Sequence, residues 1–132
     1  MENTPFATGL LDTPEKMVSM LKDVSASNLF VRLDPCHCNV SKTVFRDFCI
    51  ALEGKIESIG LHDNKGDADS HLPIGHGTVN IKSGIECLRD VGYNGSLTIE
   101  ILPFEGWSVH QAEGFLSDSK NIVDNLLAAL SN

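Results

Sequence analysis

Short apolar segments alternate with amphipathic helical segments along almost the whole chain of 132 residues. Strands that are joined by crossover helices run parallel, and their connections are right-handed. The sequence therefore predicts an α/β fold in which parallel strands alternate with helices, in the order helix, strand, helix, strand, helix, strand, helix. The expected strands are 29–34, 56–62 and 96–101.

Four helices are predicted from capping residues and apolar stripes. The first begins at Asp12-Thr13-Pro14-Glu15, which combines a capping residue, a proline and an acid in the first turn. The segment from Pro35 to Asn39 is expected to turn into a second helix that is capped by Ser41 and runs to Leu52. The other two are expected at 79–91 and from about Gln111 or Leu116 to Leu130.

The two faces of the expected strands differ in polarity. One face is apolar and carries Val31, Leu33, Ile59, Leu61, Leu97, Ile99 and Ile101. The other face carries Phe30, Arg32, Asp34, Ser58, Gly60, His62, Ser96, Thr98 and Glu100. Doubly wound sheets are covered on both faces and prefer nearly continuous apolar strands. A polar face with Asp34, His62 and Glu100 at the carboxyl ends of the strands favours instead a barrel interior with an active site at its top.

The segment 62–78 combines three histidines and three aspartates with glycine and proline, between an expected strand and an expected helix. Neutral imidazole and carboxylate are ligands of first-row metals. In an extended chain, Asp69 and His71 point the same way. By itself the segment fits a solvated acidic loop as well as a site for a dication or an anionic substrate.

Length, charge and composition limit the classes of function that this chain can have. The length suits one domain, residues 1–132. A net charge of −8 argues against a nucleic-acid partner, because affinity for phosphates depends on cationic side chains. No apolar run approaches the ~20 residues of a membrane span, and no signal peptide is recognisable. We therefore expect a cytoplasmic protein without a membrane partner.

Four cysteines, Cys36, Cys38, Cys49 and Cys87, form no paired C-x-x-C motifs and are expected to be reduced thiols. The Cys36-His37-Cys38 run suggests a thiolate zinc site, but the chain lacks a second pair of soft ligands that would complete it.

Several motifs together resemble one family. They are Glu2-Asn3-Thr4, Asp34-x-x-His37, the segment His62-Asp63-Asn64-x-Gly66-x-x-Asp69-x-His71-Leu72-Pro73-Ile74-Gly75-x-Gly77, Gly92-Tyr93-Asn94-Gly95, and Glu100. This pattern resembles the xylose isomerase-like TIM barrels, which comprise sugar phosphate isomerases and epimerases and the endonuclease IV type of apurinic endonuclease. The resemblance covers almost the whole chain and corresponds to the C-terminal half of the eight-stranded barrel. The expected fold is thus a half TIM barrel.

The resemblance implies a divalent metal ion (Mn, Mg, Co or Zn) held by acids and a histidine at the ends of the last four strands. Glu2, Asp34 and Glu100 match three of these ligands, and Glu2 and Glu100 also match the residues that exchange protons with the substrate. His37, Asp69 and His71 match elements that hold a further metal in the endonucleases or contact sugar hydroxyls in the isomerases.

Two positions depart from the family pattern. The usual histidine ligand is replaced by Gly60, and His62, about 6–7 Å further along the same strand face, is expected to take over as metal ligand. His76 stands where the family usually has a glutamate between two glycines.

Three hypotheses follow. The first is a metal-dependent isomerase or epimerase of a sugar or sugar phosphate, in which Glu2 and Glu100 move a proton through an enediolate. The second is a phosphodiesterase that cleaves abasic DNA. The third is a catalytically inactive half-barrel or binding module. Because a half-barrel exposes unpaired strand edges, we also expect a homodimer or docking with an N-terminal half-barrel.

Overall fold

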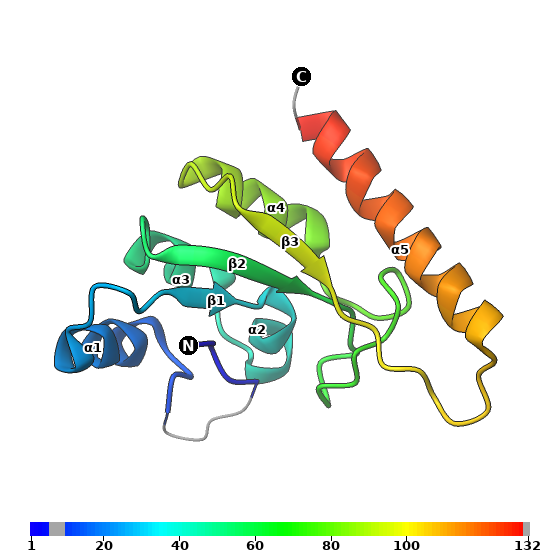
Figure 1. Ribbon diagram of the computed structural model, residues 1–132, viewed down its shortest axis with the longest axis horizontal. Coiled ribbons are helices and arrows are strands. Elements are labelled where there is room, and N and C mark those ends of the chain that lie inside the picture. Colours follow the sequence, from blue (N-terminus) through cyan, green and yellow to red (C-terminus); the bar gives the residue numbers. More distant parts are fainter. Residues whose placement is uncertain (6–9, 131–132) are drawn as a thin grey trace.

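The computed structural model describes residues 1–5 and 10–130 and contains one sheet of three parallel strands in the order β1-β2-β3 (Figure 1). The strands are β1 (Val31–Leu33), β2 (Ile56–Leu61) and β3 (Ser96–Ile99). Each strand is followed by helix, so the predicted parallel α/β alternation is confirmed. The strands begin or end up to two residues inside the predicted ranges, which is the usual uncertainty of element boundaries.

A row of helices covers one side of the sheet. Its members are α1 (Pro14–Val24), α3 (Phe45–Ala51), α4 (Ile81–Asp90) and α5 (Val109–Leu130). α1 contacts α3, α3 contacts α4, and α5 contacts both α4 and β3. Figure 1 shows α3 and α4 behind the strands, with α5 reaching beyond them at the edge of the molecule. This order of helices is that of the outer layer of a barrel wall.

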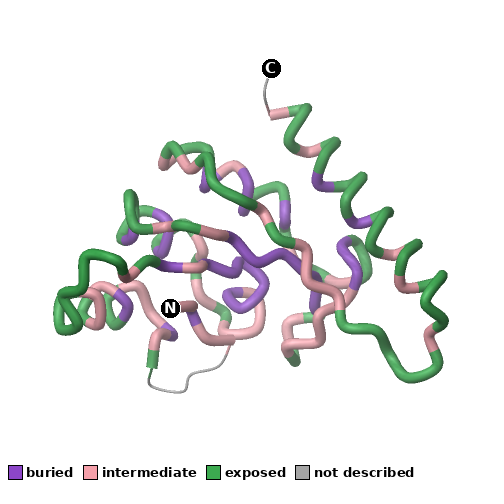
Figure 2. The backbone as a smooth tube through the Cα atoms, viewed as in Figure 1, coloured by how far each residue is buried: buried purple, intermediate pink, exposed green. Residues whose placement is uncertain are grey.

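The apolar strand face forms the core beneath these helices. Val31, Leu33, Ile59 and Leu61 are at most 1% exposed. They pack with apolar side chains of the helices, including Phe48, Leu52, Ile85 and Leu88. Figure 2 shows the buried backbone concentrated along β1 and β2. Leu97 and Ile99 are only partly buried, because among residues 1–5 and 10–130 β3 has a strand neighbour on one side alone.

The polar strand face is extended by residues just outside the strands. Glu2 forms a parallel bridge to Arg32, and the Arg32 amide donates to the Met1 carbonyl at 2.8 Å. Beyond the end of β3, the Glu100 amide donates to the Leu61 carbonyl at 2.9 Å. Glu2 and Glu100 are therefore held in sheet-like positions on opposite sides of β2.

The predicted helix start at Ser41 is wrong. The segment begins a separate helix, α2 (Pro35–Ser41), which is followed by α3. Asp34 caps α2, because its carboxylate accepts hydrogen bonds from two amides of the first turn and a proline follows at the first helical position. Lys42, with φ of 58°, then ends α2 in the left-handed region. Ser41 is the last residue of this helix.

The last helix begins earlier than predicted. Ser108 and Gln111 form a capping box, in which the Gln111 amide donates to Ser108 Oγ and the Ser108 amide donates to Gln111 Oε1. The S-x-x-Q spacing is visible in the sequence and was overlooked in the prediction. Neither α5 nor any other helix in the described ranges is long and apolar enough to cross a membrane.

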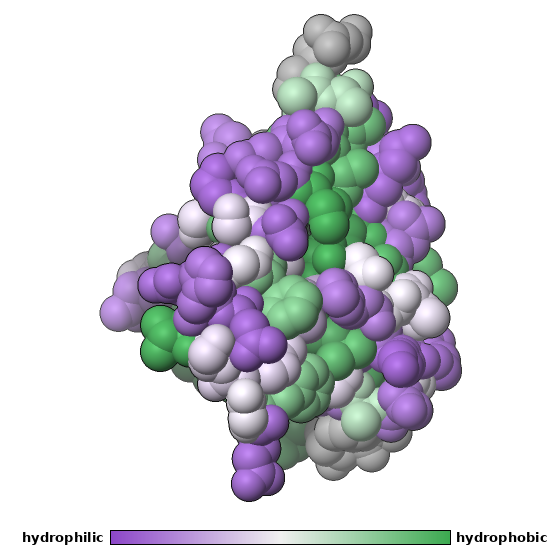
Figure 3. All heavy atoms as spheres, turned by 90° about the vertical axis from the view of Figure 1, so that its right-hand side faces the viewer, coloured by the Kyte–Doolittle hydropathy of each residue, from purple (hydrophilic) through white to green (hydrophobic). Residues whose placement is uncertain are grey.

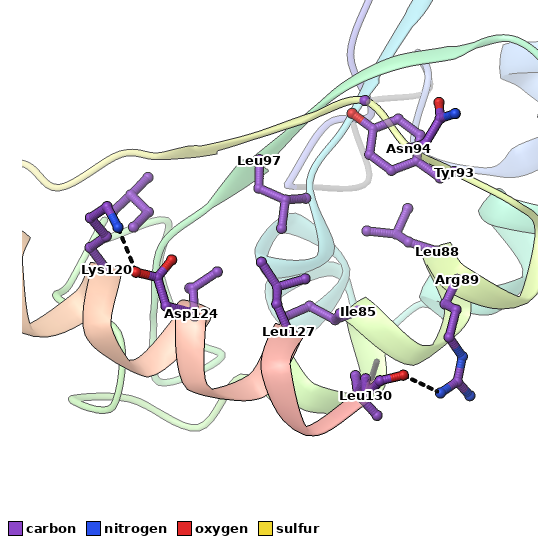
Figure 4. A pocket seen from close by; sticks show the side chains of 13 residues that line it. Ile85, Leu88, Arg89, Tyr93, Asn94, Leu97, Lys120, Asp124, Leu127 and Leu130 are labelled. Carbon is purple, nitrogen blue, oxygen red and sulfur yellow. Dashed lines mark hydrogen bonds and ion pairs between the residues drawn. The ribbon is translucent and has the colours of Figure 1, made fainter. Parts of the chain in front are cut away.

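An apolar groove separates α5 from β3 and α4. Leu97 and Ile85 line it from the sheet and α4, and Leu127 and Leu130 line it from α5 (Figure 4). Figure 3 shows hydrophobic side chains on the same side of the molecule, where α5 lies. The exposed Val109 and Leu116 lie near the start of this helix. α5 is thus only partly packed within this chain.

Candidate metal centre and glutamate pair

Five side chains from three separate segments converge at the carboxyl ends of β1 and β2. We call them the His/Asp cluster: Asp34, His37, His62, Asp69 and His71. His62 Nε2 lies 3.4 Å from Asp34 Oδ2 and 3.3 Å from Asp69 Oδ1. His37 Nε2 and His71 Nε2 each lie 3.5 Å from Asp69 Oδ2. The structure thus brings together five of the seven site residues that were predicted from the sequence.

All three histidines present the same nitrogen to the centre of the cluster. In each ring Nδ1 lies within hydrogen-bond distance of a backbone carbonyl, which can only accept. The carbonyls of Asn3, Asp63 and Glu100 lie 2.7, 3.2 and 3.3 Å from His37, His62 and His71 respectively. In the neutral ring the proton therefore sits on Nδ1, and Nε2 offers its lone pair to the cluster. This is how metal-binding histidines are usually oriented.

The cluster holds buried ligand atoms that make no hydrogen bond among the described residues. Asp34 Oδ2, His62 Nε2 and Asp69 Oδ1 are buried, and none of them makes a hydrogen bond within the described part of the chain. Buried polar atoms of this kind require an explanation. Zn–N and Zn–O bonds of about 2.0–2.1 Å separate the ligands of a tetrahedral ion by roughly 3.3–3.4 Å, the spacing seen here. The residues present therefore fit a divalent ion.

The position of Asp34 follows from its place in the chain. Oδ1 accepts from the amides of Cys36 at 2.6 Å and His37 at 3.3 Å, which leaves Oδ2 for the cluster. The side chain of Asn3 pairs with the backbone of Asp34, donating to its carbonyl at 2.9 Å and accepting from its amide at 2.8 Å. Asn3 therefore fixes the backbone of Asp34 and, through its own carbonyl, the ring of His37.

The loop that carries Asp69 and His71 is organised by Asp63. Its carboxylate accepts four backbone hydrogen bonds, from the amides of Asn64, Gly75, Gly77 and Val79 at 2.8–3.0 Å. A Cβ at Gly77 would lie 2.3 Å from Asp63 Oδ1, so this position has no room for a side chain. Asp63 thus has a structural role, which the acid-rich sequence alone does not distinguish from that of a ligand.

His71 has a backbone conformation that is uncommon for residues other than glycine. Its φ is 46°, in the left-handed region that non-glycine residues rarely adopt. The neighbouring Leu72 exchanges two 2.8 Å hydrogen bonds with Asp63, and the His71 ring stacks on His62 at 3.9 Å between centroids. Strained residues of this kind concentrate at functional sites.

Electrostatics couples Asp34 to His62. Burial raises the pKa of Asp34, but the adjacent His62 imidazole and the charge of His37 outweigh burial, so the pKa of this carboxyl lies below its ordinary value. Burial lowers the pKa of His62, and pairing with Asp34 outweighs it, so the pKa of this imidazole lies above its ordinary value. The two groups favour an ion pair when the protein is free of metal, and a metal must displace the proton from His62.

Cys36 lies beside this cluster but is a poor ligand. Burial, followed by the charge of Asp34, raises the pKa of the Cys36 thiol well above its ordinary value, and metals bind the thiolate. Its sulfur lies 2.7 Å from the His62 carbonyl and 3.2 Å from the His62 amide. Burial likewise raises the pKa of Cys38 to about 12. Cys36 thus links α2 to the residue that follows β2, whereas Cys38 Sγ lies 3.6 Å from Asn3 Nδ2.

Glu2 and Glu100 share one guanidinium, and of the two only Glu2 also lies near the His/Asp cluster. Arg32 Nε donates to Glu2 Oε1 at 3.1 Å, and Arg32 Nη2 donates to Glu100 Oε1. A carboxylate oxygen of Glu2 lies within 4.8 Å of a ligand atom of Asp34 and of one of His37, so these three residues could share an ion. Glu100 belongs to none of the ligand groups found among the described residues. The ligand roles predicted for both glutamates stay predictions. The sequence prediction overlooked the role of Arg32.

Comparison with other proteins places this arrangement in a family. The sequence matches the family described as xylose isomerase-like TIM barrel over residues 1–118. An uncharacterised protein of Methanocaldococcus jannaschii is 33% identical over 108 residues, which are 76% of this chain and 35% of that protein. The D-psicose 3-epimerase of Ruminiclostridium cellulolyticum is 30% identical over 98 residues, which are 72% of this chain and 31% of that enzyme.

Solved structures agree with this assignment. A D-tagatose 3-epimerase-like protein matches with a TM-score of 0.81 at 30% identity, over 98% of this chain and 46% of that protein. An L-ribulose 3-epimerase matches with a TM-score of 0.69 at 18% identity, over 100% of this chain and 50% of that enzyme. This chain spans about a third of the length of the two relatives and about half of these two structures, as a partial barrel should. The chain belongs to the xylose isomerase-like TIM barrel family.

Proposed function

We propose that this chain supplies the metal centre of a metal-dependent epimerase or isomerase that acts on a sugar or sugar phosphate. The observation that carries the proposal is the convergence of three buried ligand atoms without hydrogen bonds, on Asp34, His62 and Asp69. His37 and His71 add two further Nε2 atoms to the same place. The relatives named as 3-epimerases of psicose and tagatose favour a ketose as substrate.

The residues of the cluster would hold the ion, and the glutamates would move protons. A bound dication would supply Lewis-acid polarisation of the substrate's carbonyl and neighbouring hydroxyl oxygens. Glu2 and Glu100 reach the polar strand face from opposite sides of β2. Epimerisation removes a proton from one face of a carbon beside the carbonyl, which gives an enediolate, and returns a proton to the other face. One ionised and one protonated glutamate can perform both transfers.

We further propose that the barrel is completed by a second half-barrel, either another copy of this chain or a separate N-terminal half. β3 has no strand neighbour on its outer side within the described residues, and α5 leaves its apolar groove open. Exposed edges of parallel strands and apolar grooves favour association. Closure would also cover the polar face that carries Arg32 and the glutamates.

Proton exchange tests the activity directly. The chain is loaded with Mn²⁺ and incubated in D₂O with D-psicose, D-tagatose or L-ribulose, and NMR follows deuterium incorporation beside the carbonyl and the appearance of the epimer. Glu100→Gln keeps the shape and removes the base, so it should abolish exchange. If the metal-loaded, fully associated protein exchanges no proton in any ketose, the inactive half-barrel replaces this proposal.

One feature favours a second candidate. His37, Asp69 and His71 also match the elements that the endonuclease branch uses for a further metal, and their Nε2 and carboxylate atoms meet here. The net charge of −8 opposes binding to DNA. Incision of a duplex that contains one abasic site, measured beside the ketose assay, decides between the two activities.

A further inference from the structure

The geometry points to Arg32 as a tethered cation for Glu2 and Glu100, which keeps the Glu100 carboxylate out of metal coordination and leaves the dication to the His/Asp cluster. This inference rests on the proposed function and deepens it, because it separates the residues that hold the ion from those that face the substrate. Arg32 is a positioning residue in this scheme: it acts through the two glutamates.

The contacts of Arg32 support this role. Two different nitrogens of one planar guanidinium bind one oxygen of each glutamate. Glu2 is held beside β1 by its bridge to Arg32, and Glu100 follows β3, so the guanidinium spans the polar face between them. Two carboxylates directed into the same space repel each other unless a cation lies between them. Here that cation is part of the chain.

Gly60 provides the space for this arrangement. A Cβ at position 60 would lie 2.7 Å from Arg32 Nη2 and 2.7 Å from Asp34 Oδ2. The φ of Gly60 is not positive, so its backbone does not require glycine; the lack of space does. A side chain at this position would displace either the guanidinium or the oxygen that Asp34 offers to the cluster. Arg32 and Gly60 therefore form one unit on neighbouring strands.

The space at Gly60 also marks the border between the His/Asp cluster and the side chains that pair with Arg32. Arg32 Nη2 and Asp34 Oδ2 flank a single small space; Glu100 pairs with this guanidinium nitrogen, and His62 lies beside this aspartate oxygen. An ion that bound both glutamates would have to displace the guanidinium or lie beside its positive charge. Like charges at such short range are unfavourable even when solvent screens them. Within the described chain the ion pairs of the His/Asp cluster involve histidines alone, and a histidine can release its proton to a metal.

Metal binding to wild type and three variants tests the inference. Zn²⁺ affinity and stoichiometry are measured by calorimetry and by metal analysis of dialysed protein for wild type, Glu100→Gln, Arg32→Met and the double variant. Wild type and Glu100→Gln should bind one ion with affinities that agree within about twofold, because no ligand is lost. Arg32→Met frees the glutamates and should bind a second ion. The double variant should lose that second ion again.

Two outcomes would overturn the inference. One is a loss of Zn²⁺ affinity of more than about tenfold in Glu100→Gln. Removal of a direct ligand should weaken binding by at least this factor. The other is a folded Arg32→Met protein without a second ion. Arg32→Gln, an uncharged variant with an amide, repeats the test if the methionine variant does not fold. Arg32→Lys keeps the charge and should show no second ion.

The design also separates this inference from the proposed function. If wild type binds no Zn²⁺, the proposed metal centre fails. Arg32→Met still reports on the glutamates in that case, because any ion it gains must depend on Glu100 and disappear in the double variant.

Discussion

Two acidic layers lie at the carboxyl ends of the strands: the His/Asp cluster and the glutamate layer, which consists of Glu2 and Glu100. They differ in how their charge is balanced. Asp34 and His62 are fully buried, with side-chain exposure of 0%, and their facing atoms lack hydrogen bonds within the described chain. Glu2 and Glu100 are 38% and 36% exposed and share the guanidinium of Arg32. The glutamates are neutralised by a cation of the chain, whereas the His/Asp cluster has buried ligand atoms that make no hydrogen bond among the described residues.

This difference shows what a cluster of acids can mean. Carboxylates that meet a cation of the chain at the surface form an ion pair of small net energy, typically 0–1 kcal/mol. Carboxylates and imidazoles buried without hydrogen bonds are costly unless something else binds them. Acidic residues alone therefore do not indicate a metal site, whereas converging buried ligand atoms without hydrogen bonds favour one.

Removal of a histidine ligand should have the largest effect. His62→Gln keeps a polar side chain but removes Nε2 from the cluster, so Zn²⁺ or Mn²⁺ affinity should fall by more than about 100-fold, beyond the usual cost of losing an outer partner. The matched control is His76→Gln in the same loop, which is exposed and should leave the affinity unchanged. Calorimetric titration measures both. Equal affinities in the two variants would remove His62 from the centre.

Substitution of Asn3 should have the next largest effect. Asn3→Asp removes the amide donor to the Asp34 carbonyl and adds a buried negative charge next to Asp34. Unfolding free energy should fall by about 1–3 kcal/mol, the cost of a buried group without its partner. Metal affinity should fall by about 10–100-fold. Urea titration and calorimetry measure the two effects, and a change in stability without a change in affinity would confine Asn3 to a structural role.

The pH dependence of stability should reverse when metal is added. In metal-free protein the raised pKa of His62 stabilises the fold below about pH 6.5, and this contribution is lost as pH rises through the raised value. The lowered pKa of Asp34 stabilises the fold above about pH 3.9, and this contribution is lost as pH falls through the lowered value.

Metal-free protein should therefore be most stable between these limits, whereas saturating Zn²⁺ should stabilise increasingly above pH 6.5, because the ligand imidazole must be neutral. Thermal unfolding with EDTA and with Zn²⁺, from pH 4 to 8, measures both profiles. Parallel profiles would show that no ion competes with the proton on His62.

The glutamate layer should give the smallest effect. Glu2→Gln breaks one partly exposed contact with Arg32, so unfolding free energy should change by no more than about 1 kcal/mol, and added salt should reduce the difference. Chemical denaturation at low and high salt provides the test. A larger loss that salt does not change would mean that a second half-barrel buries this layer, and sedimentation equilibrium of the same samples would detect it.

Local patterns in the sequence were sufficient to predict most of the fold. The parallel strands, their apolar and polar faces, and three of the predicted helices depend on periodicity and on residues within one element. The second helix was misplaced because Asp34 was considered only as a strand-end acid, although an aspartate before proline also caps a helix. The early start of α5 was missed although the Ser108 and Gln111 spacing is local.

The sequence by itself determined which residues could form a site and that three strand ends would bring many of them together: Asp34, His37, His62, Asp69 and His71 were all predicted. Only the tertiary structure decided how they divide. Arg32 meets Glu2 and Glu100 across 30 and 68 positions, and Asn3 reaches Asp34 across 31. No periodicity encodes such contacts, because they depend on strand register and on the space left by a glycine on the neighbouring strand. Burial then decided the rest, since it left one oxygen each of Asp34 and Asp69 without a hydrogen bond among the described residues, while the partly exposed glutamates share a guanidinium.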